Sequence, residues 1–317
     1  MAHKRKLGLT ALEVSPIAFG GNVFGWTLDE TASFQLLDAL IDGGYNFIDT
    51  ADVYSKWVPG NKGGESETII GNWLSKRGKR DDVVIATKLG AEMDKDKKGL
   101  KAAYVKEAVE ASLKRLKTDY IDLYQTHYDD EATPVEETME ALNTLIEEGK
   151  VRYIGASNFK AARIAASNEF ARKNNLQPYV SIQPLYNLYD RQTFETEYLS
   201  LVQDQNLAVL NYYALASGFL TGKYRTEADL SKSQRGETVK QYLNERGERI
   251  LVALEEIAAN KSATKAQIAI AWLLHKPFIT APIASATNEK QLHDLITSAD
   301  IALSSEEIKI LDNASSY

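Results

Sequence analysis

The stretch Tyr45-Asn-Phe-Ile-Asp-Thr-Ala-Asp-Val-Tyr54 joins a short apolar run to ionisable groups. A glycine pair interrupts the helical pattern before it, and its first aromatic and aliphatic residues suit a buried strand. Asp49 then lies where that strand should emerge into a loop, and Tyr54 follows five residues later. If both face one pocket, the carboxylate can orient a cation and the phenol can handle a proton. Without partners elsewhere, the simpler interpretation is an Asp49 that caps a turn and a Tyr54 on the surface.

The same pattern recurs in the next two predicted strands. Asp82-Val-Val-Ile-Ala-Thr-Lys88 has four apolar residues before its lysine, and the strand from Asp119 ends at His127. Apolar residues at helical spacing predict separating helices over residues 29–43, 65–76 and 102–116. Three consecutive strands are therefore predicted to end in Asp49, Lys88 and His127.

The rest of the chain continues this alternation. A hairpin over Arg5–Phe19 leads into a first strand at residues 17–19, and a polar segment spans residues 218–245. Further strands are predicted at residues 151–156, 180–183, 207–212 and 278–283; further helices are predicted at 134–149 (with a capping-type start at Thr133-Pro134), 160–173, 193–205, 243–259 and 264–275, and two more helical patterns close the chain.

Eight strands alternating with helices predict an α/β protein with a parallel (β/α)8 TIM barrel, an N-terminal β-hairpin and two extra helices. No Pro/Gly/Ser-rich linker divides the chain, so residues 1–317 are expected to form a single domain. The competing fold is a doubly wound open sheet. The barrel is preferred because the ionisable residues follow many different strands, and because no GxGxxG loop follows the first strand.

The composition argues against several classes of protein. Residues are 44% apolar, and the net charge of −7 comes from 44 acidic and 37 basic residues with neither sign in a long block, so no nucleic-acid partner is expected. No segment approaches the ~18 unbroken apolar residues of a membrane span or the apolar core of a signal peptide, which predicts a cytoplasmic protein without a membrane partner. Cysteine is absent and the four histidines are scattered, so no metal site is expected.

Five motifs occur in order along the chain. They are Gly44-Tyr-Asn-Phe-Ile-Asp-Thr-Ala-Asp-Val-Tyr54, Ile85-Ala-Thr-Lys88, Asp119-Tyr-Ile-Asp-Leu-Tyr-Gln-Thr-His127, Gly149-Lys-Val-Arg-Tyr-Ile-Gly-Ala-Ser-Asn-Phe159 and Gly218-Phe-Leu-Thr-Gly-Lys-Tyr224. Any one could arise by chance, but all five together are specific. The chain thereby resembles the aldo-keto reductase family, in its bacterial type, over essentially its whole length. This resemblance implies an NAD(P)H-dependent oxidoreductase that reduces aldehydes or ketones to alcohols.

The resemblance further implies a catalytic tetrad of Asp49, Tyr54, Lys88 and His127. A phenol with an ordinary pKa of ~10 can protonate an alkoxide, and an adjacent Lys88 ammonium lowers that pKa and eases the reverse step. Asp49 holds Lys88, while a neutral His127 orients the carbonyl oxygen and stabilises its developing charge. No protein side chain donates hydride, so a nicotinamide cofactor is required. A surface lysine and a core histidine are simpler interpretations of each residue alone, but not of the four together.

The resemblance also implies a set of cofactor contacts. Ser157, Asn158 and Gln183 are assigned to the nicotinamide carboxamide and Tyr212 to stacking on its ring; Leu215, Ser217, Gly218, Leu220, Thr221 and Lys223 are assigned to the pyrophosphate loop, and Ser285, Thr287 and Gln291 to the adenosine end. Simpler interpretations are a Tyr212 that completes barrel packing and a merely solvated loop. Tyr212-Tyr-Ala-Leu-Ala stands where a Tyr-Ser-Pro-Leu-Ala segment is common.

The cofactor preference is less clearly indicated than the cofactor itself. Many relatives place an Arg or Lys near residues 285–288 for the 2′-phosphate, and only Lys290 lies nearby in this chain. NADP(H) is therefore expected to be preferred, with NAD(H) possible and modest discrimination between them.

The predicted substrate is a small-molecule carbonyl compound of unidentified structure. An aromatic wall of Trp26, Trp57 and Tyr128, from three different loops, is expected to set the substrate range, although both tryptophans could simply anchor their loops. A second functional hypothesis is a cofactor-binding regulatory protein of the same fold with little turnover. A third hypothesis, a metal-assisted barrel hydrolase, ranks far below these two. It needs clustered His and Asp metal ligands at the strand ends, and only one strand is predicted to end in a histidine.

Overall fold

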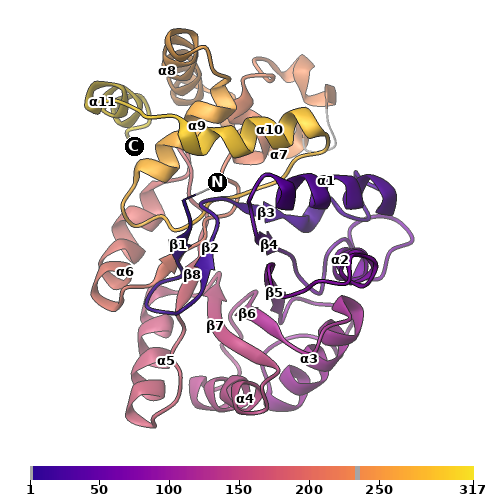
Figure 1. The fold of residues 1–317 in the computed structure, drawn as a ribbon. Coiled ribbons are helices and arrows are strands. Elements are labelled where there is room, and N and C mark those ends of the chain that lie inside the picture. Colours follow the sequence, from indigo (N-terminus) through magenta and orange to yellow (C-terminus); the bar gives the residue numbers. More distant parts are fainter. Residues whose placement is uncertain (1–2, 233–235) are drawn as a thin grey trace.

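Eight parallel strands form the centre of the computed structural model, which describes residues 3–232 and 236–317 (Figure 1). They are β3 (Ala18–Gly20), β4 (Phe47–Asp49), β5 (Val84–Leu89), β6 (Ile121–Thr126), β7 (Val151–Ser157), β8 (Ser181–Gln183), β9 (Ala208–Val209) and β10 (Ile283–Ala284), in the order β10-β3-β4-β5-β6-β7-β8-β9. The two ends of this order also meet. Val209 of β9 forms a parallel bridge with Ile279, in the segment that leads into β10, and accepts a hydrogen bond from the Thr280 N–H at 3.0 Å. This closure confirms the predicted (β/α)8 barrel and excludes the open sheet.

Helices surround the strands, one after most of them (Figure 1). They are α1 (Glu30–Asp42), α2 (Glu65–Arg77), α3 (Ala102–Leu116), α4 (Val135–Glu147), α5 (Ala161–Lys173), α6 (Leu199–Gln205), α9 (Lys265–His275) and α10 (Glu289–Thr297), with the one-turn α7 (Gly236–Val239) before α8 (Glu245–Lys261), and α11 (Ser305–Ala314) last. The α8 and α11 helices exceed the one-helix-per-strand pattern and pack on each other, as the prediction of two extra helices requires.

The predicted hairpin is present and covers one end of the barrel. Its strands β1 (Arg5–Lys6) and β2 (Glu13–Val14) pair antiparallel. Leu7 and Val14 are fully buried in one cluster with inward-facing barrel residues, among them Phe47 and Leu123. Because the hairpin seals this end, the loops that follow the strands are left at the opposite, open end, where ligand sites of such barrels lie.

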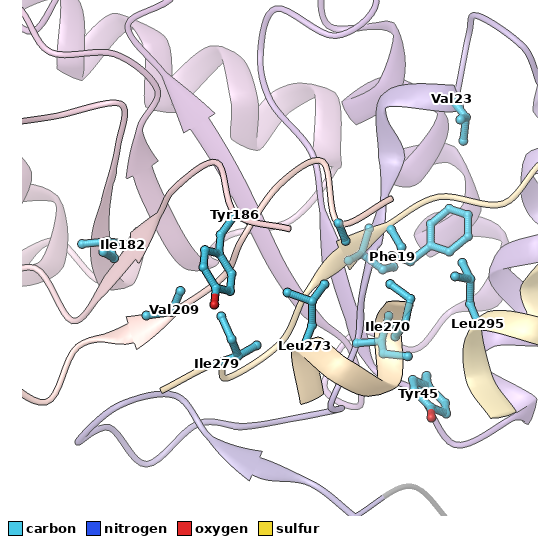
Figure 2. Close-up of a cluster of buried hydrophobic side chains, with 14 of the residues drawn as sticks. Phe19, Val23, Tyr45, Ile182, Tyr186, Val209, Ile270, Leu273, Ile279 and Leu295 are labelled. Carbon is cyan, nitrogen blue, oxygen red and sulfur yellow. The ribbon is translucent and has the colours of Figure 1, made fainter. Parts of the chain in front are cut away.

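A second apolar layer lies between the strands and the helices. Figure 2 shows Ile279 beside the side chain of Leu273, which projects from α9, with Val209 and then Ile182 farther along the same cluster. All are less than 4% exposed. Burial of each such side chain stabilises the fold by about 1.5–3 kcal/mol relative to exposure, so this layer holds the strand ends in register.

Several element boundaries differ from the predictions. Strand eight is confined to Ile283–Ala284, because the preceding Pro282 has no N–H for a strand ladder. The helix predicted over 193–205 begins with a π-helical turn at Phe194–Tyr198 before α6. The capping-type start at Thr133 was wrong, since the N-cap residue of α4 is Pro134 and the Thr133 hydroxyl donates to Asp130 at 2.6 Å instead. In the polar segment, positions 233–235 lie outside the described residues.

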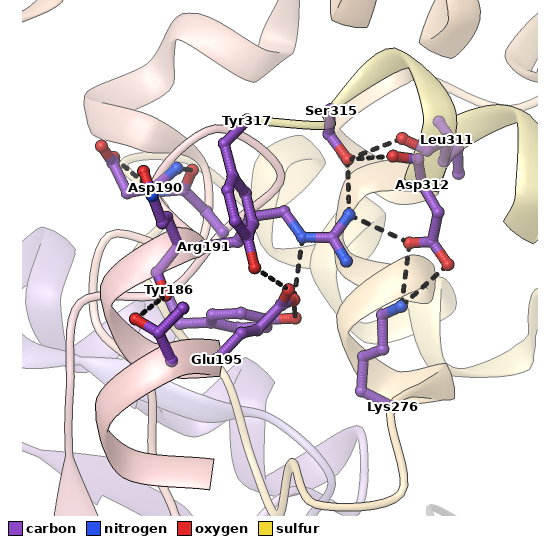
Figure 3. Close-up of polar contacts among 12 residues, drawn as sticks. Tyr186, Asp190, Arg191, Glu195, Lys276, Leu311, Asp312, Ser315 and Tyr317 are labelled. Atoms are coloured by element: carbon purple, nitrogen blue, oxygen red, sulfur yellow. Dashed lines mark hydrogen bonds and ion pairs between the residues drawn. The ribbon is translucent and has the colours of Figure 1, made fainter.

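An ion-pair network joins the C-terminal region to the loop after β8 (Figure 3). Arg191 in that loop donates to the carboxylates of Glu195 at 2.8 Å and Asp312 at 3.2 Å, and to the hydroxyl of Ser315 at 2.7 Å. Lys276 also donates to Asp312 at 2.9 Å. These contacts attach the loop after β8, which borders the open end of the barrel, to α11 and to the end of α9.

Candidate active site

A buried ion pair lies at the open end of the barrel. The Lys88 ammonium on β5 donates to the Asp49 carboxylate at the end of β4 at 2.7 Å, to the Thr50 carbonyl at 2.7 Å and to the Tyr54 hydroxyl at 3.4 Å. Lys88 is 0% exposed and Asp49 is 2% exposed. The structure thus brings together three of the four residues that the resemblance assigned to catalysis.

Two amide side chains hold the other oxygen of Asp49. Gln183 of β8 donates to it at 2.8 Å, and Gln125 of β6 donates at 3.4 Å. Gln183 was expected to serve the cofactor, and this bond to Asp49 was not foreseen. Gln125 was missed altogether, although its place two residues before His127 put it on the inward side of a predicted strand.

Tyr54 remains protonated at neutral pH. Burial raises the pKa of the Tyr54 phenol, Lys88 opposes this rise and Asp49 adds to it, and the net direction is upward. The expected lowering by Lys88 is therefore present but smaller than the effect of burial. Although burial alone would lower the pKa of Lys88, its interactions with Asp49 and Tyr54 raise that pKa above its ordinary value. A neutral phenol thus lies beside an ammonium ion.

His127 follows β6 and is neutral. Burial, with a smaller effect of Lys88, holds the pKa of His127 well below its ordinary value. Its ring lies 5.9 Å from that of Tyr54, edge to face, and its Nδ1 has no hydrogen-bond partner within residues 3–232 and 236–317. Asn158 donates to its main-chain carbonyl at 2.9 Å. The imidazole is thus able to donate or accept one hydrogen bond near the phenol.

The three aromatic residues predicted to contact substrate lie around this phenol. Trp57 packs edge to face on Tyr54 at 5.5 Å and on Trp26 at 5.7 Å, while Tyr128 stacks on His127 at 4.9 Å. Trp57 is 47% exposed and Tyr128 is 52% exposed. They form an open, uncharged aromatic rim directly beside the phenol.

The residues expected to contact the nicotinamide form one hydrogen-bonded row. Ser157 donates to the Gln183 carbonyl at 2.9 Å, and Asn158 donates to the Ser157 hydroxyl at 3.1 Å. The Tyr212 hydroxyl donates to the Asn158 side-chain oxygen at 3.0 Å. A cavity of about 350 Å³ lies next to this row, and residues 189–194 of the loop that carries Arg191 line its other side.

The predicted pyrophosphate loop has an unusual backbone. Ser217 and Gly218 have φ of 56° and 95°, the left-handed region that glycine adopts without strain. Thr221 donates to the Gly218 carbonyl at 2.7 Å, and Lys223 is exposed. The Leu220 side chain is fully buried in the core and so stabilises the loop, while Leu215 is half-buried.

The predicted adenosine end lies where β10 leads into α10. The Ser285 hydroxyl contacts the Gly20 carbonyl at 2.8 Å and the Asn22 side chain at 2.7 Å, which joins two strand ends. Thr287 donates to Gln291 through its main-chain N–H at 2.8 Å and its hydroxyl at 3.0 Å. Lys290 pairs with Asp294 at 3.1 Å and is exposed.

Neither a metal-binding cluster nor a membrane-spanning helix is found in the part of the chain that the structure describes. It contains no group of three or more His, Cys, Asp or Glu side chains able to hold a metal ion. None of its helices is both long and apolar enough to cross a membrane.

Comparison with known proteins agrees with this geometry. The profile of the Aldo/keto reductase family matches residues 16–316. The uncharacterized oxidoreductase YrpG of Bacillus subtilis is 34% identical over 97% of this chain and 94% of its own length. A probable voltage-gated potassium channel subunit beta of Arabidopsis thaliana is 36% identical over 94% of this chain and 91% of its own length. An aryl-alcohol dehydrogenase [NADP(+)] of Phanerodontia chrysosporium is 31% identical over 98% of this chain and 85% of its own length. The chain therefore belongs to the aldo/keto reductase family of NAD(P)H-dependent oxidoreductases.

Proposed function

We propose that this protein reduces aldehydes or ketones to alcohols, with Tyr54 as the general acid. The observation that carries the proposal is the contact of the Lys88 ammonium with both Asp49 and Tyr54 in a buried setting. A carbonyl oxygen beside Tyr54 becomes negatively charged as the carbon is reduced, and the phenol is the nearest group that holds a transferable proton. The phenolate left after transfer lies next to Lys88, which stabilises its charge.

His127 orients the substrate in this proposal. Because His127 is neutral, it donates a hydrogen bond to the carbonyl oxygen without competing as a proton source. Its ring packs on Tyr128 and lies beside Tyr54, so an oxygen that contacts the phenol also lies near the imidazole. Two donors in fixed positions favour the developing alkoxide more than the ground-state carbonyl.

The described residues fit a nicotinamide cofactor. Ser157, Asn158 and Gln183 present hydroxyl and amide groups suited to a carboxamide, and the Tyr212 ring borders the same space. When bound there, the cofactor supplies the hydride. Gln183 also donates to Asp49, so the residue that would hold the cofactor is hydrogen-bonded to the group that holds Lys88.

NADP(H) is the proposed preferred cofactor. Thr287, Asn288 and Lys290 lie at the first turn of α10, where a helix N-terminus favours a phosphate. No arginine stands among them, and Lys290 already pairs with Asp294. An Arg or Lys clamp on a 2′-phosphate is worth on the order of 1.5–3 kcal/mol, so the weaker set here predicts discrimination of only about ten- to a hundredfold.

The test is turnover of an aromatic aldehyde by the purified protein, followed through the loss of NADPH absorbance. Tyr54→Phe is expected to abolish turnover while cofactor affinity stays within a few-fold, because it removes the proton donor and little of the pocket's shape. A Tyr54→Phe variant that keeps most of its kcat would refute the role of Tyr54. Cofactor binding with no turnover by the unmodified protein would instead favour the regulatory alternative, which the potassium channel subunit among the relatives keeps open.

A further inference from the structure

A second carboxylate lies buried behind the active site. Asp52 follows β4 by three positions and is 1% exposed. Among the described residues no side chain hydrogen-bonds either of its carboxylate oxygens, and the neighbouring Val53 N–H is the one donor that acts on the group. Its main-chain N–H donates to the Lys88 carbonyl at 3.1 Å. A buried carboxylate that no side chain pairs with is costly, so its presence beside catalytic candidates requires a physical explanation.

The charged groups that surround Asp52 do not neutralise it. Glu67, in the first turn of α2, is 0% exposed and accepts from Arg115 of α3 at 2.7 Å and from Thr87 of β5 at 2.6 Å. Arg115 also donates to the Ser112 hydroxyl at 3.2 Å, and Lys88 donates to Asp49, Thr50 and Tyr54. The other titratable groups facing Asp52 are the phenols of Tyr104 on α3 and Tyr124 on β6.

Two buried carboxyl groups therefore share one nearby guanidinium. Glu67 pairs with that guanidinium directly at 2.7 Å, which leaves Asp52 without a cation of its own among the described residues. Burial, followed by repulsion from Glu67, raises the pKa of Asp52 well above its ordinary value, and the opposing effects of Arg115, the Val53 N–H and Lys88 are smaller. A neutral carboxylic acid at Asp52 avoids placing a second negative charge in this space.

The same contacts connect Asp52 to the position of Tyr54. The Tyr54 carbonyl accepts from the N–H groups of Gly64 at 3.0 Å and Ser66 at 3.2 Å, at the start of the helix that carries Glu67. The segment before Tyr54 is also held to β5, because the main-chain N–H of Asp52 donates to the main-chain carbonyl of Lys88. A second charge at Asp52 would repel Glu67 and so separate the two segments that hold Tyr54.

We propose that Asp52 is a positioning residue that acts as a neutral carboxylic acid and holds Tyr54 against Lys88. Its protonation follows from the charge arrangement alone, whereas its effect on Tyr54 rests on the proposed function. The two parts are tested by different measurements.

Infrared spectroscopy of the unmodified protein tests the protonation. At pH 7 in deuterium oxide we expect the carbonyl band of a protonated carboxyl group, and this band should be missing from Asp52→Asn. A spectrum of the unmodified protein without such a band overturns the proposal, whether or not any variant folds and whether or not the protein turns over an aldehyde.

The pH dependence of stability provides a second readout. A carboxyl group whose pKa is higher in the folded state stabilises the fold below its unfolded pKa of ~3.9, and this contribution is lost as the pH rises through the folded pKa. Asp52→Asn should therefore gain stability relative to the unmodified protein as the pH rises, whereas the exposed control Asp81→Asn should show no such trend. A difference that is constant with pH contradicts the proposal.

Kinetics test the positioning role. Asp52→Ala should lower kcat by about tenfold, with cofactor affinity unchanged within about twofold. It leaves an empty buried space into which the segment that carries Tyr54 can shift, and small displacements of a reacting group are costly. Asp52→Asn should restore kcat, since an amide retains the shape and the neutral charge. An Asn variant as impaired as the Ala variant overturns the proposal.

Discussion

Removal of the buried ammonium of Lys88 should lower both the free energy of unfolding and kcat, for two different reasons. Lys88→Met keeps the length of the side chain and removes its charge. Asp49 would then lie 2% exposed with the amides of Gln183 and Gln125 as its only side-chain donors among residues 3–232 and 236–317. Loss of one partner of a buried ion pair costs about 3–5 kcal/mol, a large fraction of the 5–15 kcal/mol by which domains are stable.

The activity loss has a different origin. Without Lys88, the Tyr54 phenolate that remains after proton transfer has no cation beside it, and general-acid catalysis of this kind contributes about 10²- to 10⁴-fold to the rate. Lys88→Met should therefore lose kcat by roughly that factor. Lys95→Met is the matched control, because Lys95 is exposed in the loop after β5.

The double variant Asp49→Asn/Lys88→Met separates the two effects. It leaves no unpaired buried charge, so urea unfolding should show it to be more stable than Lys88→Met alone, while its kcat stays low. The assay is a double-mutant cycle in unfolding free energy, run beside aldehyde kinetics on the same samples. Additive stability losses in the cycle, or a Lys88→Met cost below about 1 kcal/mol, would show that the pair is not the coupled unit described above.

Three further predictions concern the rim, the cofactor and the imidazole. Trp57→Ala should change kcat/KM unequally for aldehydes of different size, because Trp57 packs on Tyr54 at the open rim; equal changes for all would indicate that it only anchors its loop. Tryptophan fluorescence titration should show tighter binding of NADPH than of NADH, and Lys290→Ala should reduce this difference in affinity. Equal or tighter binding of NADH would contradict the proposed preference for NADP(H). Because the folded pKa of His127 is lowered, the unfolded chain binds that proton first, and stability should fall as pH drops below ~6.5 by up to about 1.4 kcal/mol per pH unit. His127→Gln should lack this component between pH 5 and pH 6.5, and an unchanged slope would argue against a neutral His127.

Much of the architecture could be predicted because it depends on local patterns. Alternating apolar runs and amphipathic stretches gave the barrel, and strands that end in polar residues located Asp49, Lys88 and His127 at its open end. Boundaries were less predictable where a proline or a π-helical turn altered the backbone, as at Pro282 and Phe194–Tyr198.

The chain sequence by itself determined which strands carry ionisable ends, since strand period and glycine breaks are properties of neighbouring residues. Only the tertiary structure decided which groups meet. Gln183 turned out to contact Asp49, and the buried carboxyl groups of Asp52 and Glu67 lie near the half-buried Arg115, although the three come from a loop and two different helices. No local pattern could reveal this, because the energy of a buried charge depends on every group packed around it, and that packing is set by how the whole barrel closes.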